Sequence, residues 1–522
     1  MLLKKLCSYA AAAFLCICLV SCGTVFPGTE APTVPSETPA SSAEEPTAET
    51  PSEETTAEET PAPRFLVGFG RREIMPEDSV IMSNYGVNRW SDGYNNLMYA
   101  NVIALTDELG TTLLLIDLDT ATVPDNMISS IKKELKSAYG IPADMIRISN
   151  THNHAAVDLT KSSETNNRYV KQLTDWILEA AEDAINSRTP SSIEIGTSIV
   201  ESMNFVRHYI TVDGDLLGDN YISTPSIPEC ASHVDEPDKT LQVIRFVREN
   251  AKDLILVGWR AHNHLGAGAT ITKLQGGYPV AMVESLEKKL DCNAVFYQLD
   301  AGRINAHSRI KSEMLYEDIF SYGEALADRV IETLERMEPI ESGPIRSLTT
   351  TWRGKIHHDQ PIIVSIALKV YTEWQKGEMN STEARRMCIE ENEKMNLSYH
   401  DGVHSVFHAM KVYGRTALQA NGKTTLNAYA IGDSLAFTFD SYEMFDENGR
   451  YIRENSPFKM TLTVSYSDPN INDQSGYVPS IEAFNYGCYE ADCCSWEPGA
   501  GEALAETFVE MLKQLKEQAS AR

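Results

Sequence analysis

The stretch Ile146-Arg-Ile-Ser-Asn-Thr-His-Asn-His154 ends a predicted β-strand with two histidines that stand one residue apart. A second triplet, His262-Asn-His264, follows the apolar run at residues 254–259. Two such triplets at strand ends indicate the halves of one metal site, because imidazole nitrogen suits zinc and neighbouring transition metals. Residues i and i+2 of a strand face the same side, so both rings of a triplet can converge on one point. One triplet alone would be interpreted as a loop cap or a core hydrogen bond.

Strand-like and helix-like segments alternate around these triplets. Strands are predicted at residues 65–70, 101–105, 112–117, 193–195, 241–246, 254–257 and 294–297, a turn at 71–76, and helices at 125–139, 167–187, 279–290 and 314–337. Further strands are predicted at 362–370, 426–431, 435–439 and 460–466, and further helices near 383–394, 403–412 and 502–518. This alternation predicts an α/β fold in which mixed β-sheets are flanked by helices. Because no second linker interrupts the composition, residues 64–522 are expected to form a single large domain.

The first 63 residues have the composition of a targeting segment followed by a tether. Lys4 and Lys5 precede a short apolar run, and Leu19-Val20-Ser21-Cys22 resembles the lipobox of bacterial lipoproteins. The resemblance implies a signal peptide over residues 1–21, a lipid on Cys22, and a location outside the cytoplasm at the cell membrane. An ordinary secretory signal is the alternative. Residues 22–63, rich in Pro, Thr and Glu, are expected to be a disordered tether.

The net charge limits the classes of partner. The formal charge of the chain is −29, and residues 64–522 hold −22 of it once the nine glutamates of the tether and the two early lysines are set aside. A body this acidic is not expected to bind nucleic acid or to make broad contact with anionic lipid. The sequence gives no indication of the oligomeric state.

Cysteine usage is uninformative about the fold. Residues 64–522 contain six cysteines: Cys230, Cys292, Cys388, Cys488, Cys493 and Cys494. A disulfide among them is possible in an extracytoplasmic compartment, but its connectivity cannot be deduced, and their spacing is not that of a zinc finger.

Four motifs, in chain order, resemble segments of the neutral, non-lysosomal ceramidase family. They are Val67-Gly-Phe-Gly-Arg-Arg-Glu-Ile-Met-Pro76 with Asn84-Tyr-Gly86, Ser149-Asn-Thr-His-Asn-His154, Phe296-Tyr-Gln-Leu-Asp-Ala-Gly-Arg-Ile-Asn305, and Asn472-Asp-Gln-Ser-Gly-Tyr-Val-Pro-Ser480 with Cys488-Tyr-Glu490. The resemblance covers nearly all of residues 64–522. It implies a ceramidase-like catalytic domain that cleaves an amide (N-acyl) bond with metal-activated water, and hence a small-molecule or lipid N-acyl substrate.

The resemblance also implies the residues of the site. Four zinc ligands are implied: His152, His262, Glu443 and Tyr477. Four groups beside the water or the substrate are implied: His154, Arg207, Tyr489 and Asn305. Zinc would lower the pKa of bound water to about 7 and polarise the amide carbonyl, while the neighbouring side chains steady the oxyanion and protonate the leaving amine.

Several positions depart from the family pattern. Asn305 stands at the place of a serine and cannot act as a nucleophile, Arg303 replaces an aspartate, Ala306 a proline, and Gln474 a tyrosine. The family's C-terminal β-sandwich domain is not expected after the helix near residues 502–518. Attack by metal-activated water is compatible with these changes, but they leave open whether ceramide is the substrate.

Other interpretations of the same residues remain. Glu443 could be a solvated acid, Tyr477 a packed aromatic, and Arg207 could pair with Asp213 or another acid. His264 is interpreted as a residue that orients its loop. His400, His404 and His408 could line one helix face and are interpreted as a polar face or cap, and residues 357–359 as a loop.

Two rival functions follow from these readings. In a binuclear hydrolase of the metallo-β-lactamase type Asp158 would join His152 and His154, but it lies too far along the chain and a further histidine is missing. In a non-catalytic, tethered solute-binding lipoprotein the site would be degenerate, which Arg303 and Asn305 favour.

Overall fold

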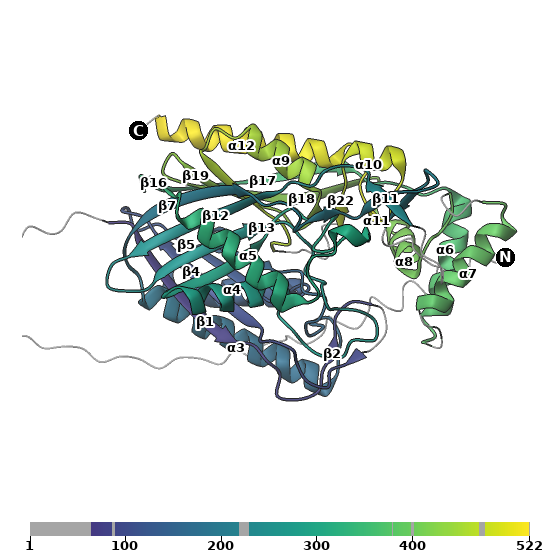
Figure 1. Cartoon of the computed structure of the whole chain (residues 1–522), viewed down its shortest axis with the longest axis horizontal. Coiled ribbons are helices and arrows are strands. Elements are labelled where there is room, and N and C mark those ends of the chain that lie inside the picture. Colours follow the sequence, from purple (N-terminus) through teal and green to yellow (C-terminus); the bar gives the residue numbers. More distant parts are fainter. Residues whose placement is uncertain are drawn as a thin grey trace, which may run out of the picture. The chain divides into compact units, whose positions relative to one another are not determined.

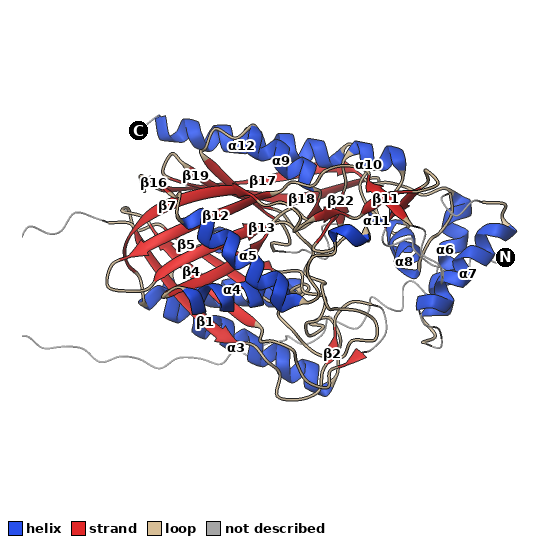
Figure 2. Cartoon of the chain, in the orientation of Figure 1, coloured by secondary structure: helices blue, strands red, loops and turns tan. Residues whose placement is uncertain are grey.

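Two β-sheets pack face to face in the computed structural model, and helices cover their outer faces (Figures 1 and 2). The structure describes residues 64–85, 89–218, 229–377, 379, 381–397, 401–468 and 476–520. Strands that are apolar throughout lie between these layers, because both of their faces are covered. In β5 (Thr112–Leu118), for example, every residue after Thr112 is buried.

The larger sheet has nine strands. Its order is β14 (Cys292–Gln298), β13 (Asp253–Trp259), β12 (Thr240–Arg248), β7 (Thr189–Ile199), β1 (Leu66–Glu73), β4 (Tyr99–Thr106), β5 and β6 (Ile146–Asn150), with β16 (Glu338–Ile340) beside β7. Only β5–β6 and β13–β14 pair in parallel, and α2 (Asp125–Tyr139) and α4 (Gly277–Lys289) connect these two pairs. The end strands β6 and β14 also contact each other, so the sheet curls and brings its two parallel pairs together.

The smaller sheet lies against the inner face of the larger one. Its order is β17 (Ile345–Lys355), β18 (Asn421–Ile431), β19 (Leu435–Phe439) and β21 (Met460–Val464). Side chains of β18 alternate between two cores, since Tyr429 and Ile431 face the larger sheet and Ala428 and Ala430 face the helices. Those helices are α9 (Asp446–Glu454) and α12 (Ala500–Ser520), which lies along β17 and β18 (Figure 1). On the other side, α3 (Glu164–Asn186) packs on β1 and β4, and α5 (Ile319–Leu334) packs on α4.

Short elements outside the two large sheets carry most of the polar residues considered below. They are β2 (Ile81–Met82), β3 (Arg89–Trp90), η1 (Ala143–Met145), β8 (Phe205–Val206), β9 (His208–Thr211), β10 (Leu216–Gly218), β11 (Cys230–His233), β15 (Ile304–Asn305), η3 (Lys311–Glu313), β20 (Glu443–Met444), β22 (Tyr477–Val478), α10 (Ile481–Tyr486) and α11 (Tyr489–Cys493). A three-helix insert precedes β18 and consists of α6 (Pro361–Trp374), α7 (Ser381–Lys394) and α8 (Val406–Arg415).

The predicted α/β class, with mixed sheets flanked by helices in one large domain, is confirmed. The predicted strand at residues 362–370 is wrong, because this segment is helix α6. Pro361 occupies its first turn, and Ile366, Ala367 and Val370 are buried at helical spacing, so packing against α8 outweighs the β-branched composition. Strand β1 continues to Glu73 where a turn was predicted, and α5 begins at Ile319 instead of near residue 314.

No disulfide joins any two of the six cysteines that the structure describes. No helix among residues 64–520, in the part that the structure describes, is long and apolar enough to cross a membrane. Cys22 with its tether, Gln474 and His400 lie outside the described residues.

Candidate metal centre

The two His-Asn-His triplets follow the carboxyl ends of β6 and β13 and meet there. Each of these strands belongs to a different parallel pair, β5–β6 and β13–β14. The backbone N–H of His154 donates to the carbonyl of Asn263, 3.1 Å away. The two central asparagines hold both loops to the segment before α4, because Asn153 donates to the carbonyl of Gln275 and Asn263 to that of Gly276. Sequence reasoning missed this use of the asparagines, although their repetition in both triplets was a visible signal.

Three imidazoles converge where these loops meet. The ring centroid of His152 lies 4.8 Å from that of His154 and 5.2 Å from that of His262. One ring nitrogen from each of the three residues lies within 4.8 Å of the corresponding nitrogens of the other two. The two rings of the first triplet converge for a different reason than predicted. His152 has left the strand and adopts φ of +50°, a left-handed turn, so strand alternation does not direct them.

A carboxylate from the smaller sheet's side of the molecule completes the cluster. Glu443 Oε2 lies 3.0 Å from His262 Nε2 and 3.3 Å from His152 Nε2. Glu443 is on β20, which pairs in parallel with β22 so that Tyr477 stands directly beside it. The position of β20 depends on Gly302, since a Cβ there would lie 2.3 Å from the carbonyl oxygen of Glu443.

The donor set fits a bound cation. His262 Nδ1 lies 2.8 Å from the carbonyl oxygen of Ala301 and 3.1 Å from that of Ile304, so Nδ1 carries the proton and Nε2 presents its lone pair. That lone pair faces a carboxylate oxygen, an arrangement that a cation between them stabilises. Two ligands of a tetrahedral zinc ion lie about 3.3 Å apart when each bond is about 2.0–2.1 Å, close to the two separations from Glu443.

Electrostatics favour the same protonation states. Burial, with help from the charge of Arg207, lowers the pKa of His262 to about 4, and burial lowers the pKa of His154 well below its usual value. Burial by itself would raise the pKa of Glu443, but the facing rings of His152 and His262 outweigh it and hold that pKa well below its usual range. At neutral pH His154 and His262 are therefore neutral and Glu443 is ionised, the forms that bind metal.

Arg207 enters the centre from the junction of β8 and β9. Its Nε donates to Glu490 Oε1 at 2.6 Å, its Nη2 donates to the carbonyl of Gly302 at 2.9 Å, and its guanidinium lies 5.4 Å from the ring centre of Tyr477. Its partner is thus Glu490 on α11 and not Asp213. Burial by itself would lower the pKa of Arg207, but the negative charge of Glu490 has the larger effect and raises it. The buried guanidinium therefore stays protonated. His208 Nε2, 2.8 Å from Glu490 Oε2, steadies the same carboxylate.

Two solved structures have a fold similar to that of this chain. One with 15% sequence identity is described as "Crystal Structure Analysis of neutral ceramidase from Pseudomonas aeruginosa"; the match covers 87% of this chain and 75% of that chain with a TM-score of 0.62. Another, "Ceramidase complexed with C2", has 14% identity, coverage of 87% and 76%, and a TM-score of 0.63. The fold is the neutral ceramidase fold. No protein-family model and no curated protein matches the chain.

Within this ceramidase fold, the residues singled out from the sequence gather in one place. Tyr489 on α11 lies edge-on to Tyr477 with ring centroids 5.6 Å apart. Asn305 is buried on β15, which pairs with β8, and it forms a backbone bridge with His262. The eight residues brought together are His152, His154, Arg207, His262, Asn305, Glu443, Tyr477 and Tyr489.

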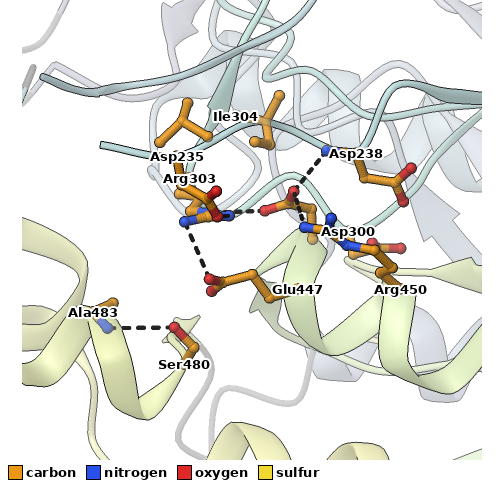
Figure 3. A network of polar contacts seen from close by, with 12 residues as sticks. Asp235, Asp238, Asp300, Arg303, Ile304, Glu447, Arg450, Ser480 and Ala483 are labelled. Atoms are coloured by element: carbon orange, nitrogen blue, oxygen red, sulfur yellow. Dashed lines mark hydrogen bonds and ion pairs between the residues drawn. The ribbon is translucent and has the colours of Figure 1, made fainter. Parts of the chain in front are cut away.

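Arg303 belongs to an ion network and not to the histidine cluster (Figure 3). Its guanidinium lies 2.8 Å from Asp446, 3.0 Å from Asp235 and 3.3 Å from Glu447. Nearby, Arg260 pairs with Asp300 at 2.9 Å, so residues 300–304 are held on both sides. This segment also supplies the carbonyl groups that orient His262, which gives the network a positioning role.

Two aromatic residues of the centre were missed from the sequence. Tyr466 stacks on His152 with ring centroids 4.3 Å apart, and Tyr85 lies edge-on to His154 at 5.7 Å. Both have positive φ, a backbone feature with no signature in the sequence. His264 is half-buried, and its ring centroid lies 5.6 Å from those of both His154 and His262. Asp158 accepts hydrogen bonds from Thr160 in its own turn, so it does not complete a binuclear set.

Proposed function

We propose that this chain is a zinc-dependent hydrolase that cleaves the amide bond of an N-acyl substrate. The observation that carries the proposal is the pair of contacts from Glu443 Oε2 to His152 Nε2 and His262 Nε2, with Nδ1 of His262 turned to backbone carbonyls. His152, His262 and Glu443, with Tyr477 beside them, would hold the metal. The ceramidase fold of the chain supports the choice of reaction class.

The first task of the site is to activate water and bind the carbonyl. Zinc held there supplies Lewis acidity to a carbonyl group and makes water a competent nucleophile near neutral pH. Arg207 remains charged because Glu490 faces it, and its Nη1 lies 3.5 Å from His262 Nε2. It is therefore placed to stabilise the negative charge that develops on the carbonyl oxygen.

The second task is proton transfer. Among the described residues, neither ring nitrogen of His154 has a hydrogen-bond partner, and burial keeps the ring neutral. His154 can thus accept the proton of the attacking water and return it to the leaving amine. Burial raises the pKa of Tyr489 well above its usual value, so its hydroxyl stays protonated and can donate to the substrate. Asn305 offers an amide for orientation and no nucleophile.

A direct test combines metal analysis with an activity screen. His152→Ala and His262→Ala should each lower the bound zinc by one equivalent and reduce amide hydrolysis at least about 1,000-fold, because each removes a ligand. The screen uses a short-chain ceramide, an N-acyl amino acid and an N-acyl amino sugar, with mass spectrometry of the released amine. His358→Ala is the matched control, since this histidine is exposed and outside the cluster.

The outcomes separate the candidate functions. Loss of hydrolysis with an unchanged number of bound zinc equivalents in either variant would show that the ligand set is wrong. A wild-type chain that binds no zinc and hydrolyses none of the three substrates would favour the tethered solute-binding alternative. The three substrates differ in the group that is attached to the amide nitrogen. The one that is hydrolysed will therefore identify this group, which the residues of the centre do not specify.

A further inference from the structure

A second cluster of metal-binding side chains lies where the three-helix insert meets α11 (Figures 1 and 2). His408 lies in the first turn of α8, His404 lies just before the N-cap residue Ser405, and Asp492 lies on α11. The sequence was interpreted as a polar helix face or a cap, and His404 is not on the helix face because it precedes α8. The cluster shares no residue with the candidate metal centre, and its argument is independent of the proposed function.

The geometry resembles a set of metal ligands. His404 Nδ1 lies 2.9 Å from Asp492 Oδ2 and 3.1 Å from His408 Nδ1, and one ligand atom from each of the three residues falls within 4.8 Å of the others. Two ligands of a tetrahedral ion with bonds of about 2.0–2.1 Å lie about 3.3 Å apart. The measured separations are thus close to those expected around one ion of this size.

Proton counting favours a cation at this point. The backbone N–H of His404 points at His408 Nδ1 from 3.4 Å, so that nitrogen presents its lone pair. His404 Nδ1 lies between His408 Nδ1 and a carboxylate oxygen of Asp492, and both of these atoms have lone pairs that face it. A cation accepts the lone pairs of all three groups at once.

The surroundings suit a divalent ion. The side chains of the two histidines are almost fully buried, while that of Asp492 is 29% exposed, which leaves one side open to an incoming ion and to water. The charge of the neighbouring Arg415 is balanced by Asp359, whose two oxygens lie 2.8 Å from the guanidinium.

We propose that His404, His408 and Asp492 bind one divalent transition-metal ion of the zinc type that fastens α8 of the insert to α11. Two imidazoles, one carboxylate and water form a common ligand set for such ions. The site would also steady the proposed centre, since α11 carries Tyr489 and Phe407 of α8 lies 5.8 Å from its ring. A chain with both sites would bind two ions. They would not form one binuclear centre, because the two sites share no ligand.

The test counts the second ion with the first site removed. The full chain carrying His152→Ala and His262→Ala is loaded with zinc or Co²⁺, desalted, and analysed for bound metal and for Co²⁺ absorption bands in the visible range. One tightly bound equivalent is expected. Adding His408→Ala should abolish both signals, and adding Asp492→Asn should weaken zinc binding at least about 10-fold.

Controls keep the result interpretable. Adding His358→Ala in place of His408→Ala should leave the bound equivalent unchanged, and circular dichroism checks that each variant is folded. A chain without His152 and His262 that binds no zinc or Co²⁺ would overturn the proposal, whatever its variants do. An equivalent that survives both His408→Ala and Asp492→Asn would also overturn it, because the ion would then be bound by other residues.

Discussion

Buried charges are the most informative single residues in this molecule. Arg207 and Arg303 are almost fully buried, and each pairs with one carboxylate that is buried as well, Glu490 and Asp446 respectively. A buried charge is costly unless it is paired, so each of these residues reports a required contact. Arg207 pairs with Glu490 beside the candidate metal centre. Arg303 pairs with Asp446 in the ion network that holds residues 300–304, the segment that orients His262.

The first residue-scale prediction concerns Arg303. Arg303→Met should lower the free energy of unfolding by about 3–5 kcal/mol, because it leaves the fully buried Asp446 without its guanidinium partner. Urea unfolding measures the change. The control is Arg329→Met, which breaks an exposed pair with Glu332 and should cost less than about 1 kcal/mol. A similarly small loss for Arg303→Met would mean that Asp446 finds another partner.

Two very short elements determine whether the centre forms. Strands β20 and β22 have two residues each, yet their parallel pairing places Glu443 beside Tyr477. Gly302 N donates to the carbonyl of Met444 at 2.8 Å, which holds β20 against the turn that orients His262. Neither strand has enough residues to show a periodic pattern in the sequence.

At this scale we predict that Gly302→Ala will damage the centre. The new Cβ would lie 2.3 Å from the carbonyl oxygen of Glu443, so β20 must shift and carry its carboxylate away from the histidines. Zinc affinity at the first site should fall at least about 10-fold in a competition titration with a chromogenic chelator.

Gly414→Ala is the matched control for this substitution. No atom lies within 4 Å of a Cβ built at Gly414 on α8, and alanine in a helix is favoured by about 0.5–1 kcal/mol. Zinc affinity should be unchanged in this variant. Equal affinities in both alanine variants would show that β20 tolerates the displacement.

For the molecule as a whole, the centre exists because the large sheet curls. Strands β6 and β14 are the two ends of the strand order, and their contact brings the loop after β6 to the loop after β13. The remaining groups arrive from elements far along the chain, with Glu443 on β20 and Tyr489 on α11. Local unfolding of any of these elements would therefore open the site.

The location of the whole molecule is a separate proposal. We propose that a lipid on Cys22 tethers the domain to a membrane outside the cytoplasm, which the sequence Leu19-Val20-Ser21-Cys22 supports. Because the body is strongly acidic, anionic lipid should not hold it without the anchor. Cys22→Ser should move the protein from the membrane fraction of bacterial cells to the soluble fraction, as measured by immunoblot. Cys18→Ser should leave the distribution unchanged, and a Cys22→Ser protein that stays in the membrane fraction would contradict the proposal.

Much of the fold and part of the centre were predictable from local signals in the sequence. Strands β5 and β13 are short apolar runs, and helix α2 has apolar residues at helical spacing. These patterns predicted the type of each element correctly. The two histidine triplets were visible because identical ligand pairs at strand ends are unusual. Where a neighbouring element decides the structure, as at α6, the composition was misleading.

The sequence by itself determined the α/β class, the acidic surface and the imidazoles that can bind a metal. Only the tertiary structure decided that Glu490 pairs with Arg207, that Arg303 turns away from the centre, and that Asp492 joins His404 and His408. The physical reason is that periodicity records which side of its own element a residue faces. Partners that are tens or hundreds of residues apart depend on sheet curvature and chain crossing, which no local pattern encodes.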